Sequence, residues 1–304
     1  MKKTVVFHNP KSGDAEHDKD QLIAALEKRS YTVQYFSTKG DWKSARLNSG
    51  EQLIVIAGGD GTVRKVTGWL LETGMLKKEI PITILPLGTA NNLSKTLKIN
   101  GTYKQLIEQW PEWKIQPYDI GRIINSDEKK KNRPFFLEAL GCGLFAHHLR
   151  NGKEEYVKKN EDDPEKKINV DQERLLLSLS KLPPCKVEIT IDNKDYHGEY
   201  LLVSIMNSMH FGTNLEFNPQ SESGDGKFDV ILIPGTDREK LEQFIIRQRE
   251  TGPNDLNFKG ISGRDIRLRS GDHLYHLDDT LYDAEEDTLI HVRANDQQLF
   301  FLAP

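Results

Sequence analysis

The 304-residue chain predicts two regions of different fold class, an α/β region with a parallel sheet and then an all-β sandwich. Up to about residue 115, strand-like and helix-like stretches alternate, which is typical of a parallel sheet covered by helices. After about residue 117, most apolar stretches are short, strand-like and separated by turns, as in an antiparallel sandwich or barrel. The length also suits two domains better than one.

The elements of the first region follow from its apolar periodicity. Leu22, Ile23 and Leu26 recur at helical spacing, whereas the apolar run over 52–57 is continuous, as expected of a fully buried parallel strand. Predicted strands cover 4–7, 31–36, 52–57 and 82–85, and predicted helices cover 18–30, 42–47, 63–71 and 90–97. Each strand is therefore followed by a helix.

In the second region, strands dominate and helices interrupt them. The stretch Asp192–Asp195 predicts a hairpin turn, because Asp and Asn accept turn conformations readily. Helices are expected over 174–182 and 238–249. The clearest predicted strands cover 186–191, 200–206, 228–233 and 266–268.

Composition excludes several classes of protein. A net charge of −4 argues against a general nucleic-acid binder. No apolar run approaches the ~18 residues of a membrane-spanning helix, and the run after Lys2 and Lys3 is too short for a secretory signal. Cys142 and Cys185 lie far apart in the sequence, which is neither a disulfide framework nor a zinc pattern. A cytoplasmic protein is the expectation.

Three loops of the first region each follow the end of a predicted strand: Asn9–Gly13, Gly58–Thr62 and Gly88–Asn92. In open α/β sheets, ligands bind at this edge. Glycines let the backbone approach a phosphate, and the following helix offers its positive N-terminal end. Lys11 adds a cation, and Thr62 can donate a hydroxyl. Asp60 alone would repel phosphate, so its presence suggests that Mg²⁺ lies between them.

Any one of these loops has a simpler explanation, since Asn-Pro and Gly-Gly pairs also make ordinary turns. Three of them at equivalent strand ends make coincidence a poor account. The Gly58–Thr62 loop lacks the spacing and the lysine of a P-loop, and the G-x-G-x-x-G fingerprint of dinucleotide-binding folds is absent.

The three loops, taken with the longer stretch Leu85–Leu93, resemble the diacylglycerol kinase catalytic-domain family, which includes sphingosine, ceramide and bacterial lipid kinases. The resemblance extends over nearly the whole chain. Its further matches are Asp119–Gly121, Gly141–Gly143, Asn207, Phe211–Gly212, Pro219 and Asp225–Val230.

The resemblance implies a two-domain kinase. Residues 1–118 would form a nucleotide-binding domain like those of phosphofructokinases and NAD kinases, and 119–296 a β-sandwich for the lipid acceptor. The last residues, 297–304, would return to the first domain. ATP would lie in the cleft between the domains and pass its γ-phosphate to a lipid hydroxyl.

The resemblance also implies roles for individual residues. Asp60 would belong to a Mg²⁺-phosphate centre, and Asp225, with the backbone carbonyls of Glu222 and Lys227, would hold a second, structural Mg²⁺. The residues expected at the nucleotide are Asn9, Lys11, Ser12, Gly13, Thr38, Gly58, Gly59, Asp60, Gly61, Thr62, Gly88 and Thr89.

Three positions depart from the family pattern. Arg64 and Lys65 follow the glycine-rich loop where the family has polar and acidic residues, and Asn92 replaces an Asp. Bacterial members carry an Asp-Gly-Glu stretch near the C-terminus, and its Glu is the proposed proton acceptor. That position falls here on Thr280, which cannot act as a general base at neutral pH. Asp278 or Asp279 could substitute if the turn is shifted by one residue.

Two functions therefore stay open. The first is an ATP-dependent lipid kinase acting on an acceptor such as diacylglycerol at a membrane surface. The second is a catalytically impaired, nucleotide-binding regulatory protein of the same family, which the loss of the Glu favours. An NAD kinase is a third option, but it would share only the Gly58–Thr62 motif. Antiparallel edge strands offer a route to a homodimer.

Overall fold

In a computed structural model, the chain divides into two compact units, Met1–Tyr118 with Gln298–Pro304, and Asp119–Gln297. The residues that the structure describes are 2–14, 17–47, 53–78, 80–124, 134–154, 164–252, 256, 258–285, 288–294 and 297–304. Among these residues, none of the helices combines the length and the apolar composition needed to cross a bilayer.

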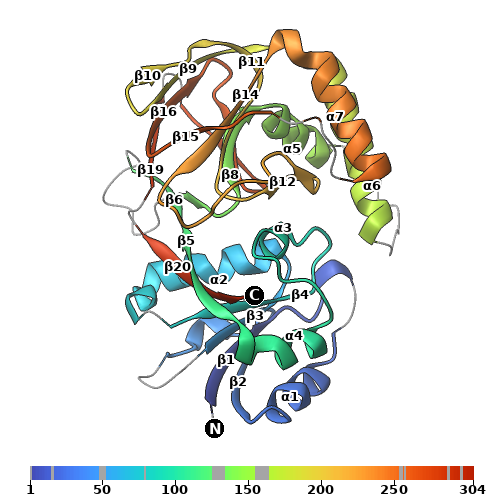
Figure 1. The fold of residues 1–304 in the computed structure, drawn as a ribbon, viewed down its shortest axis with the longest axis vertical. Coiled ribbons are helices and arrows are strands. Elements are labelled where there is room, and N and C mark those ends of the chain that lie inside the picture. Colours follow the sequence, from blue (N-terminus) through green and yellow to red (C-terminus); the bar gives the residue numbers. More distant parts are fainter. Residues whose placement is uncertain are drawn as a thin grey trace. The chain divides into compact units, whose positions relative to one another are not determined.

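The N-terminal unit is built on a 6-stranded sheet in the order β2-β1-β3-β4-β20-β5 (Figure 1). β1 pairs in parallel with β2 and β3, and β4 pairs in parallel with β3 and β20. The parallel sheet predicted from the sequence is therefore confirmed. The strands are β1 (Lys2–His8), β2 (Tyr31–Ser37), β3 (Leu53–Gly58), β4 (Ile82–Pro86), β5 (Lys114–Asp119) and β20 (Gln298–Ala303).

Helices connect these strands. Asp18 begins α1 by accepting the backbone N–H of Gln21 at 2.9 Å, and Gly74, with φ 68, ends α2. The predicted helix over 42–47 is only a short 3-10 turn, Trp42–Ser44. The helices are α1 (Lys19–Glu27), α2 (Asp60–Thr73), α3 (Asn92–Thr96) and α4 (Tyr103–Gln109), with 3-10 turns at Ser12–Asp14, Met75–Lys78 and Trp110–Glu112.

Aromatic side chains make much of the core of this unit. Phe7 of β1 is fully buried and meets the rings of Trp42 and Trp69 edge-on, at centroid distances of 5.9 and 5.4 Å. Burying one such ring is worth roughly 1.5–3 kcal/mol. The C-terminal strand joins the same core, since Phe301 lies 5.4 Å from the ring of Tyr118. Strand β20 therefore belongs to the first unit although it is the last element of the chain.

The C-terminal unit contains a 12-stranded sheet whose strand pairs are antiparallel, and a 2-stranded hairpin of β12 (His210–Phe211) and β13 (Leu215–Glu216). The strands of the large sheet are β6 (Gly121–Ile123), β7 (Phe135–Phe136), β8 (Ala139–Gly143), β9 (Cys185–Ile191), β10 (Lys194–Asp195), β11 (Gly198–Met206), β14 (Phe228–Pro234), β15 (Ile261–Gly263), β16 (Asp265–Ser270), β17 (Leu274–Leu277), β18 (Thr280–Asp283) and β19 (Ile290–Arg293).

Strand β11 joins the two halves of this sheet. One of its edges pairs with β14. The other edge pairs first with β9, at Gly198–Tyr200, and then with β8, from Leu202 onward. At the same place, between Tyr200 and Leu202, the pairing with β14 shifts its register. A strand that changes partners at such an irregularity makes a corner, so the sheet can close over itself as a sandwich. The predicted β-sandwich class is confirmed in this form.

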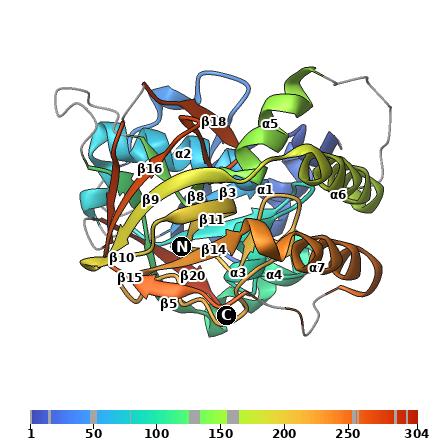
Figure 2. The ribbon, with the colours of Figure 1, turned by 90° about the horizontal axis from the view of Figure 1, so that it is seen from above.

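The two faces of β11 serve different cores. Val203 and Ile205 pack with strand residues from both halves of the sheet, among them Ile189 and Ile266. Leu202 instead packs against side chains of three helices, α5 (Leu144–Glu154), α6 (Pro164–Lys181) and α7 (Arg238–Thr251). Helices α6 and α7 lie side by side (Figures 1 and 2). Helix α5 was not expected from the sequence, whereas α6 and α7 were.

The hairpin turn predicted at Asp192–Asp195 is confirmed. Ile191 of β9 pairs with Lys194 of β10, which leaves Asp192 and Asn193 as a two-residue turn with φ 46 and 66. Positive φ at both central positions is the pattern of a type I′ turn, where Asp and Asn are tolerated.

Candidate functional site

The three glycine-containing loops lie against one another at the carboxyl ends of β1, β3 and β4. The backbone N–H of Gly59 donates to the Ser12 hydroxyl at 2.9 Å, and the Asn9 side-chain amide donates to the Thr62 hydroxyl at 3.3 Å. The N–H of Leu87 donates to the carbonyl of Gly58 at 3.1 Å. Side-chain hydrogen bonds therefore hold the first and second loops together, and a backbone hydrogen bond ties the second loop to the residue before the third.

Glycine is required where the loops touch. A Cβ on Gly88 would lie 2.4 Å from the Cα of Gly59, closer than real Cβ contacts allow. Gly13 has φ 65, and a Cβ there would lie 2.9 Å from the carbonyl oxygen of Leu87. These glycines thus do more than turn the chain, because they let three loops share one small region of the sheet edge.

Asp60 links the second loop to the third. Its two carboxylate oxygens accept the backbone N–H groups of Asn92 and Leu93, each at 3.0 Å. Asn91, with φ 52, supports the same turn, since its side-chain amide bonds both the N–H and the carbonyl of Gly88. The half-buried carboxylate therefore already organises the backbone around it.

Lys95 is a neighbour of Asp60 that the sequence did not single out. Burial lowers the pKa of Lys95, and the nearby Asp60 carboxylate acts in the opposite direction. Lys95 follows the Gly88–Asn92 stretch by one turn of α3, so the helix that begins there was the signal that could have found it.

Lys65, the second of the two cations after the glycine-rich loop, reaches back to the segment after β2. Lys65 donates from Nζ to the carbonyl of Thr38 at 3.2 Å and lies 5.2 Å over the ring of Trp42. Thr38 is itself buried and donates its N–H to the carbonyl of His8. Lys65 thus secures the chain after β2, whereas Lys11 is an exposed cation within the first loop.

His8, the last residue of β1, is a second residue that the sequence did not mark. Its Nδ1 lies 2.9 Å from the Tyr35 hydroxyl. Burial, aided by the nearby His17, lowers the pKa of His8 to about 4, so the ring is neutral near pH 7. A cavity of about 180 Å³ adjoins it, lined by His8, His17, Asp18, Gln21, Leu22, Leu87 and Tyr103.

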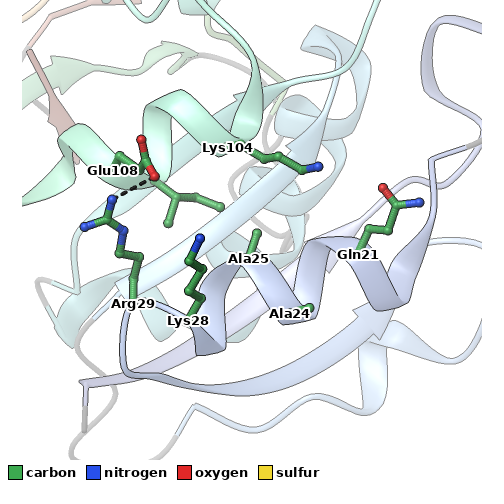
Figure 3. A pocket seen from close by; sticks show the side chains of 8 residues that line it. Gln21, Ala24, Ala25, Lys28, Arg29, Lys104 and Glu108 are labelled. Atoms are coloured by element: carbon green, nitrogen blue, oxygen red, sulfur yellow. Dashed lines mark ion pairs between the residues drawn. The ribbon is translucent and has the colours of Figure 1, made fainter.

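A larger cavity, of about 320 Å³, lies between α1 and α4 (Figure 3). Lys28 and Lys104 line it, and Arg29 forms a 2.8 Å ion pair with Glu108 across it. Its other lining residues are Gln21, Ala24, Ala25 and Ile107. Among the described residues that line it, none belongs to the predicted nucleotide site.

In the second unit, the predicted metal ligand Asp225 lies in the turn before β14. Its carboxylate accepts the N–H of Lys227 at 2.9 Å, and its own N–H points to the carbonyl of Glu222 at 3.4 Å. The buried Asp119 fixes the turn by accepting the N–H of Gly226 at 2.8 Å. One exposed carboxylate and turn carbonyls therefore lie close together, and a structural Mg²⁺ there stays a prediction.

Metal ligation by side chains alone has little support in the part of the chain that the structure describes. No group of three or more His, Cys, Asp or Glu side chains there could hold a metal ion.

Of the base candidates, Asp278 and Asp279 form the two-residue turn between β17 and β18, and Thr280 is the first residue of β18. Asp278 is 3 % exposed, and its carboxylate accepts three backbone N–H groups, those of Leu137, Glu138 and Ala139, at 2.8–3.2 Å. A carboxylate so engaged anchors β17 to the chain before β8, and this geometry argues against Asp278 as the base. Asp279 and Thr280 are exposed.

His276 lies beside this turn and is fully buried, with its ring stacked on Phe211 at 4.6 Å. Burial lowers the pKa of His276 to about 3, partly offset by a hydrogen bond with the Asp278 carbonyl. The ring is therefore neutral at ordinary pH. Its alternating position in a strand gave no sign of this in the sequence.

The family model of the diacylglycerol kinase catalytic domain matches residues 3–123. This span contains the three loops, and Asp60 is part of the second. Residues 3–123 belong to the diacylglycerol kinase catalytic-domain family. The resemblance seen in the sequence motifs is thereby confirmed.

Curated relatives extend the similarity beyond this domain. A diacylglycerol kinase of Bacillus subtilis (strain 168) is 27% identical over 262 residues, covering 81% of this chain and 77% of that protein. A YegS-like protein of Alcanivorax borkumensis, named a probable lipid kinase, is 25% identical over 188 residues, or 62% of this chain. That alignment spans 57% of the relative's length, and a Staphylococcus haemolyticus relative is likewise matched over only 56%.

The fold is also known from solved structures. A crystal structure described as a diacylglycerol kinase from Bacillus anthracis str. Sterne covers 100% of this chain and 97% of its own, with a TM-score of 0.68. A second structure from the same strain gives a TM-score of 0.71. Sequence identities are 18% and 19%, so these structures establish the fold class.

Proposed function

We propose that this protein is a lipid kinase that transfers the γ-phosphoryl group of ATP to the hydroxyl of a lipid such as diacylglycerol. The observation that carries the proposal is the mutual contact of Asn9–Gly13, Gly58–Thr62 and Gly88–Asn92 at one sheet edge. This edge is where α/β sheets bind ligands, and the residues lie in a diacylglycerol kinase catalytic domain. The acceptor lipid would be met at a membrane surface.

Phosphate binding would come from backbone and side-chain groups of these loops. The N-terminus of α2 begins at Asp60, directly after Gly59, and its dipole favours negative charge nearby. Lys11 supplies an exposed cation on the first loop. The buried Thr38 directly follows β2, whose carboxyl end lies at the same edge of the sheet. Since phosphoryl transfer depends mainly on positioning and charge neutralisation, a rigid arrangement of this kind suits the reaction.

The carboxylate of Asp60 is a suitable protein ligand for Mg²⁺. Mg²⁺ usually takes only one or two protein carboxylates, with waters and substrate phosphates completing its octahedron. The Asp60 carboxylate would be one such ligand, since it is half-buried at the start of α2 beside the glycine-rich loop. When bound with ATP, the ion would neutralise the phosphate charge. Asp60 would hold it while keeping the Asn92 turn in place.

The acceptor hydroxyl needs a partner for its proton. With Asp278 committed to three backbone N–H groups, the exposed pair Asp279 and Thr280 would serve. A threonine hydroxyl can orient an attacking hydroxyl but cannot take its proton at neutral pH. If Thr280 rather than Asp279 meets the acceptor hydroxyl, the lack of a general base would make phosphoryl transfer ~10²–10⁴-fold slower than in an enzyme with a carboxylate base.

A second candidate rests on the same observation. Because Thr280 stands where a carboxylate is expected and Asp278 is otherwise engaged, the protein could bind ATP without transferring phosphate and act in regulation. The two candidates share the nucleotide site and differ only in chemistry.

The deciding experiment supplies purified protein with radiolabelled ATP, Mg²⁺ and diacylglycerol in detergent micelles, and separates products by thin-layer chromatography. A parallel reaction with a total lipid extract covers other acceptors. Lipid kinase activity predicts a labelled phospholipid that disappears in Asp60→Asn and persists in Glu27→Gln, an exposed acidic position on α1. Thermal melting shows whether each variant is folded.

Calorimetric titration with Mg²⁺-ATP separates the remaining outcomes. Binding without labelled lipid in either reaction would support the non-catalytic candidate. Absence of both binding and transfer, in protein that melts cooperatively, would contradict both candidates.

A further inference from the structure

A groove runs between helices α1 and α4 of the first unit and holds two hollows that meet at Gln21. The cavity of about 320 Å³ in Figure 3 is one of them, and the cavity of about 180 Å³ beside His8 is the other. Gln21 lines both. From Asp18 at one end of the groove to Lys28 at the other, α1 rises about 15 Å. A single small ion is too short to occupy both ends.

The end at Lys28 is positively charged. Lys28 of α1 and Lys104 of α4 line it, and neither forms an ion pair within the described parts of the chain. The 2.8 Å ion pair of Arg29 with Glu108 lies at the far end of this hollow from Gln21 (Figure 3). A phosphate chain of more than one group would therefore meet the Glu108 carboxylate. This end thus offers two cations, from different helices, to one anionic group.

The end at His8 has a different character. Among the described residues that line this hollow, none is a lysine or an arginine. Its acidic member, Asp18, already caps α1 by accepting a backbone N–H at 2.9 Å. Leu22 and Leu87 supply aliphatic surface, and Tyr103 supplies an aromatic ring. Such walls suit a flat ring that stacks on an aromatic face and packs on aliphatic groups.

His8 brings an unused hydrogen-bonding atom to the same hollow. The side chain is fully buried, and its Nδ1 lies 2.9 Å from the hydroxyl of Tyr35, which is not among the described lining residues. Nε2, on the other side of the ring, has no hydrogen-bond partner in the described structure. Burial lowers the pKa of His8 to about 4, so the neutral ring has one donor and one acceptor nitrogen. Buried polar atoms normally have a partner, so Nε2 calls for one from outside the chain.

The groove lies on the face of the sheet opposite α2. Phe7 of β1 packs on Trp69 of α2, so the next residue, His8, points to the other face, because side chains alternate along a strand. Among the described residues that line the two hollows, none belongs to the predicted nucleotide site. His17 connects the two places, since its Nε2 lies 3.1 Å from the carbonyl oxygen of Ser12 in the first loop.

We propose that the groove between α1 and α4 binds a nucleoside monophosphate, with the phosphate between Lys28 and Lys104 and the base in the hollow beside His8. Two ammonium groups suit the charge of one phosphate. A nucleobase has polar atoms on its edge for His8 Nε2 and flat faces for Tyr103. This site is separate from the three glycine-containing loops, and it does not depend on the proposed kinase activity.

The test titrates AMP calorimetrically into the full chain at low salt, with EDTA present so that no Mg²⁺ is available to the loops. The expected result is saturable binding that weakens as sodium chloride is added, because the lysines are exposed. Ribose 5-phosphate and adenosine, each of which fills one end, should both bind more weakly than AMP. Absence of saturable AMP binding, or affinity for AMP no greater than for either fragment, would overturn the proposal.

Variants assign the two ends. The double variant Lys28→Gln/Lys104→Gln should weaken AMP binding about tenfold. Lys181→Gln, at an exposed lysine on α6, is the matched control. Tyr103→Ala should reduce the affinity for AMP toward that for ribose 5-phosphate. Asp60→Ala should leave AMP binding unchanged, and loss of binding there, with the double lysine variant unimpaired, would assign AMP to the loops and overturn the proposal.

Photolabelling locates the base in the unmodified chain, even where a variant fails to fold. The probe is 8-azidoadenosine 5′-monophosphate, with excess AMP as the competitor and tryptic peptide mapping as the readout. Label that AMP suppresses is expected on the peptide 99–104, which carries Tyr103, or on the peptide that carries His17. Label confined to other peptides, such as those with Thr38 or Gly58–Thr62, would overturn the proposal.

Discussion

Asp60 in the first unit and Asp278 in the second both hold a neighbouring backbone segment in place, and they differ in their exposure to solvent. Both carboxylates accept N–H groups from a neighbouring segment, two for Asp60 and three for Asp278. Asp60 is half-buried at a sheet edge, whereas Asp278 is 3 % exposed beneath a hairpin turn. An aspartate in a turn can therefore organise a ligand site or only the fold, and access to solvent separates the two cases.

The largest effect is expected at Thr280, two residues after the buried Asp278. Thr280→Glu would place a carboxylate at an exposed position at the start of β18 and should raise lipid phosphorylation by ~10²–10⁴-fold, as a general base typically does. Thr280→Gln is the matched control, since it has the same size without the charge. Initial rates with diacylglycerol measure the effect.

If Asp279 already acts as the base, the outcome changes in a defined way. Thr280→Glu should then do little, and Asp279→Asn should remove most activity. A Thr280→Glu protein no faster than the wild type, with Asp279→Asn equally active, would contradict both assignments.

Next in size is the loss of stability on removing Asp278. Asp278→Ala leaves the N–H groups of Leu137, Glu138 and Ala139 without their acceptor in a buried place, and each such group costs about 1–3 kcal/mol. We expect a loss of ~3 kcal/mol or more in the free energy of unfolding, measured by urea titration. Asp279→Ala, at the exposed neighbour, should change stability by no more than ~0.5 kcal/mol. Equal stability of the two variants would refute the anchoring role.

His276 predicts a dependence of stability on pH. Its pKa is lowered to about 3 in the folded protein, below the unfolded value of 6.5, so protonation favours the unfolded chain. The contribution is fully present above pH 6.5 and is lost as the pH falls from there toward 3, by about 2 kcal/mol at pH 5. Melting temperatures between pH 7 and 5 should fall less steeply in His276→Gln. An unchanged slope would show that the buried ring does not account for the acid sensitivity.

The smallest effect is expected for the stability of Asp60→Ala. Two N–H groups lose their acceptor, but the site is half-buried and water can replace the carboxylate, so the cost should be about 1 kcal/mol. Binding of Mg²⁺-ATP should nonetheless be lost in calorimetric titration. Retained affinity would separate Asp60 from the nucleotide, and a cost as large as that of Asp278→Ala would erase the contrast between the two aspartates.

Local signals made much of the fold predictable. Apolar runs such as that of β3 are buried on both faces in a parallel sheet, so their length and spacing reveal them without any partner in view. The turn at Asp192 was equally readable, because a residue type that tolerates positive φ is a local requirement. Helix α5 was missed because it begins directly after the buried strand residue Gly143, with no polar cap to announce it.

The sequence by itself determined the first four strands and the helices α1 to α3 of the first unit, the three loops at its strand ends and the family to which they belong. Each of these depends on a residue's near neighbours along the chain. The tertiary structure decided that Asp278 serves the fold and that Lys65 donates to the Thr38 carbonyl. These outcomes depend on which distant backbone groups and side chains lie beside a residue and exclude water from it, and spacing along the sequence carries no record of that.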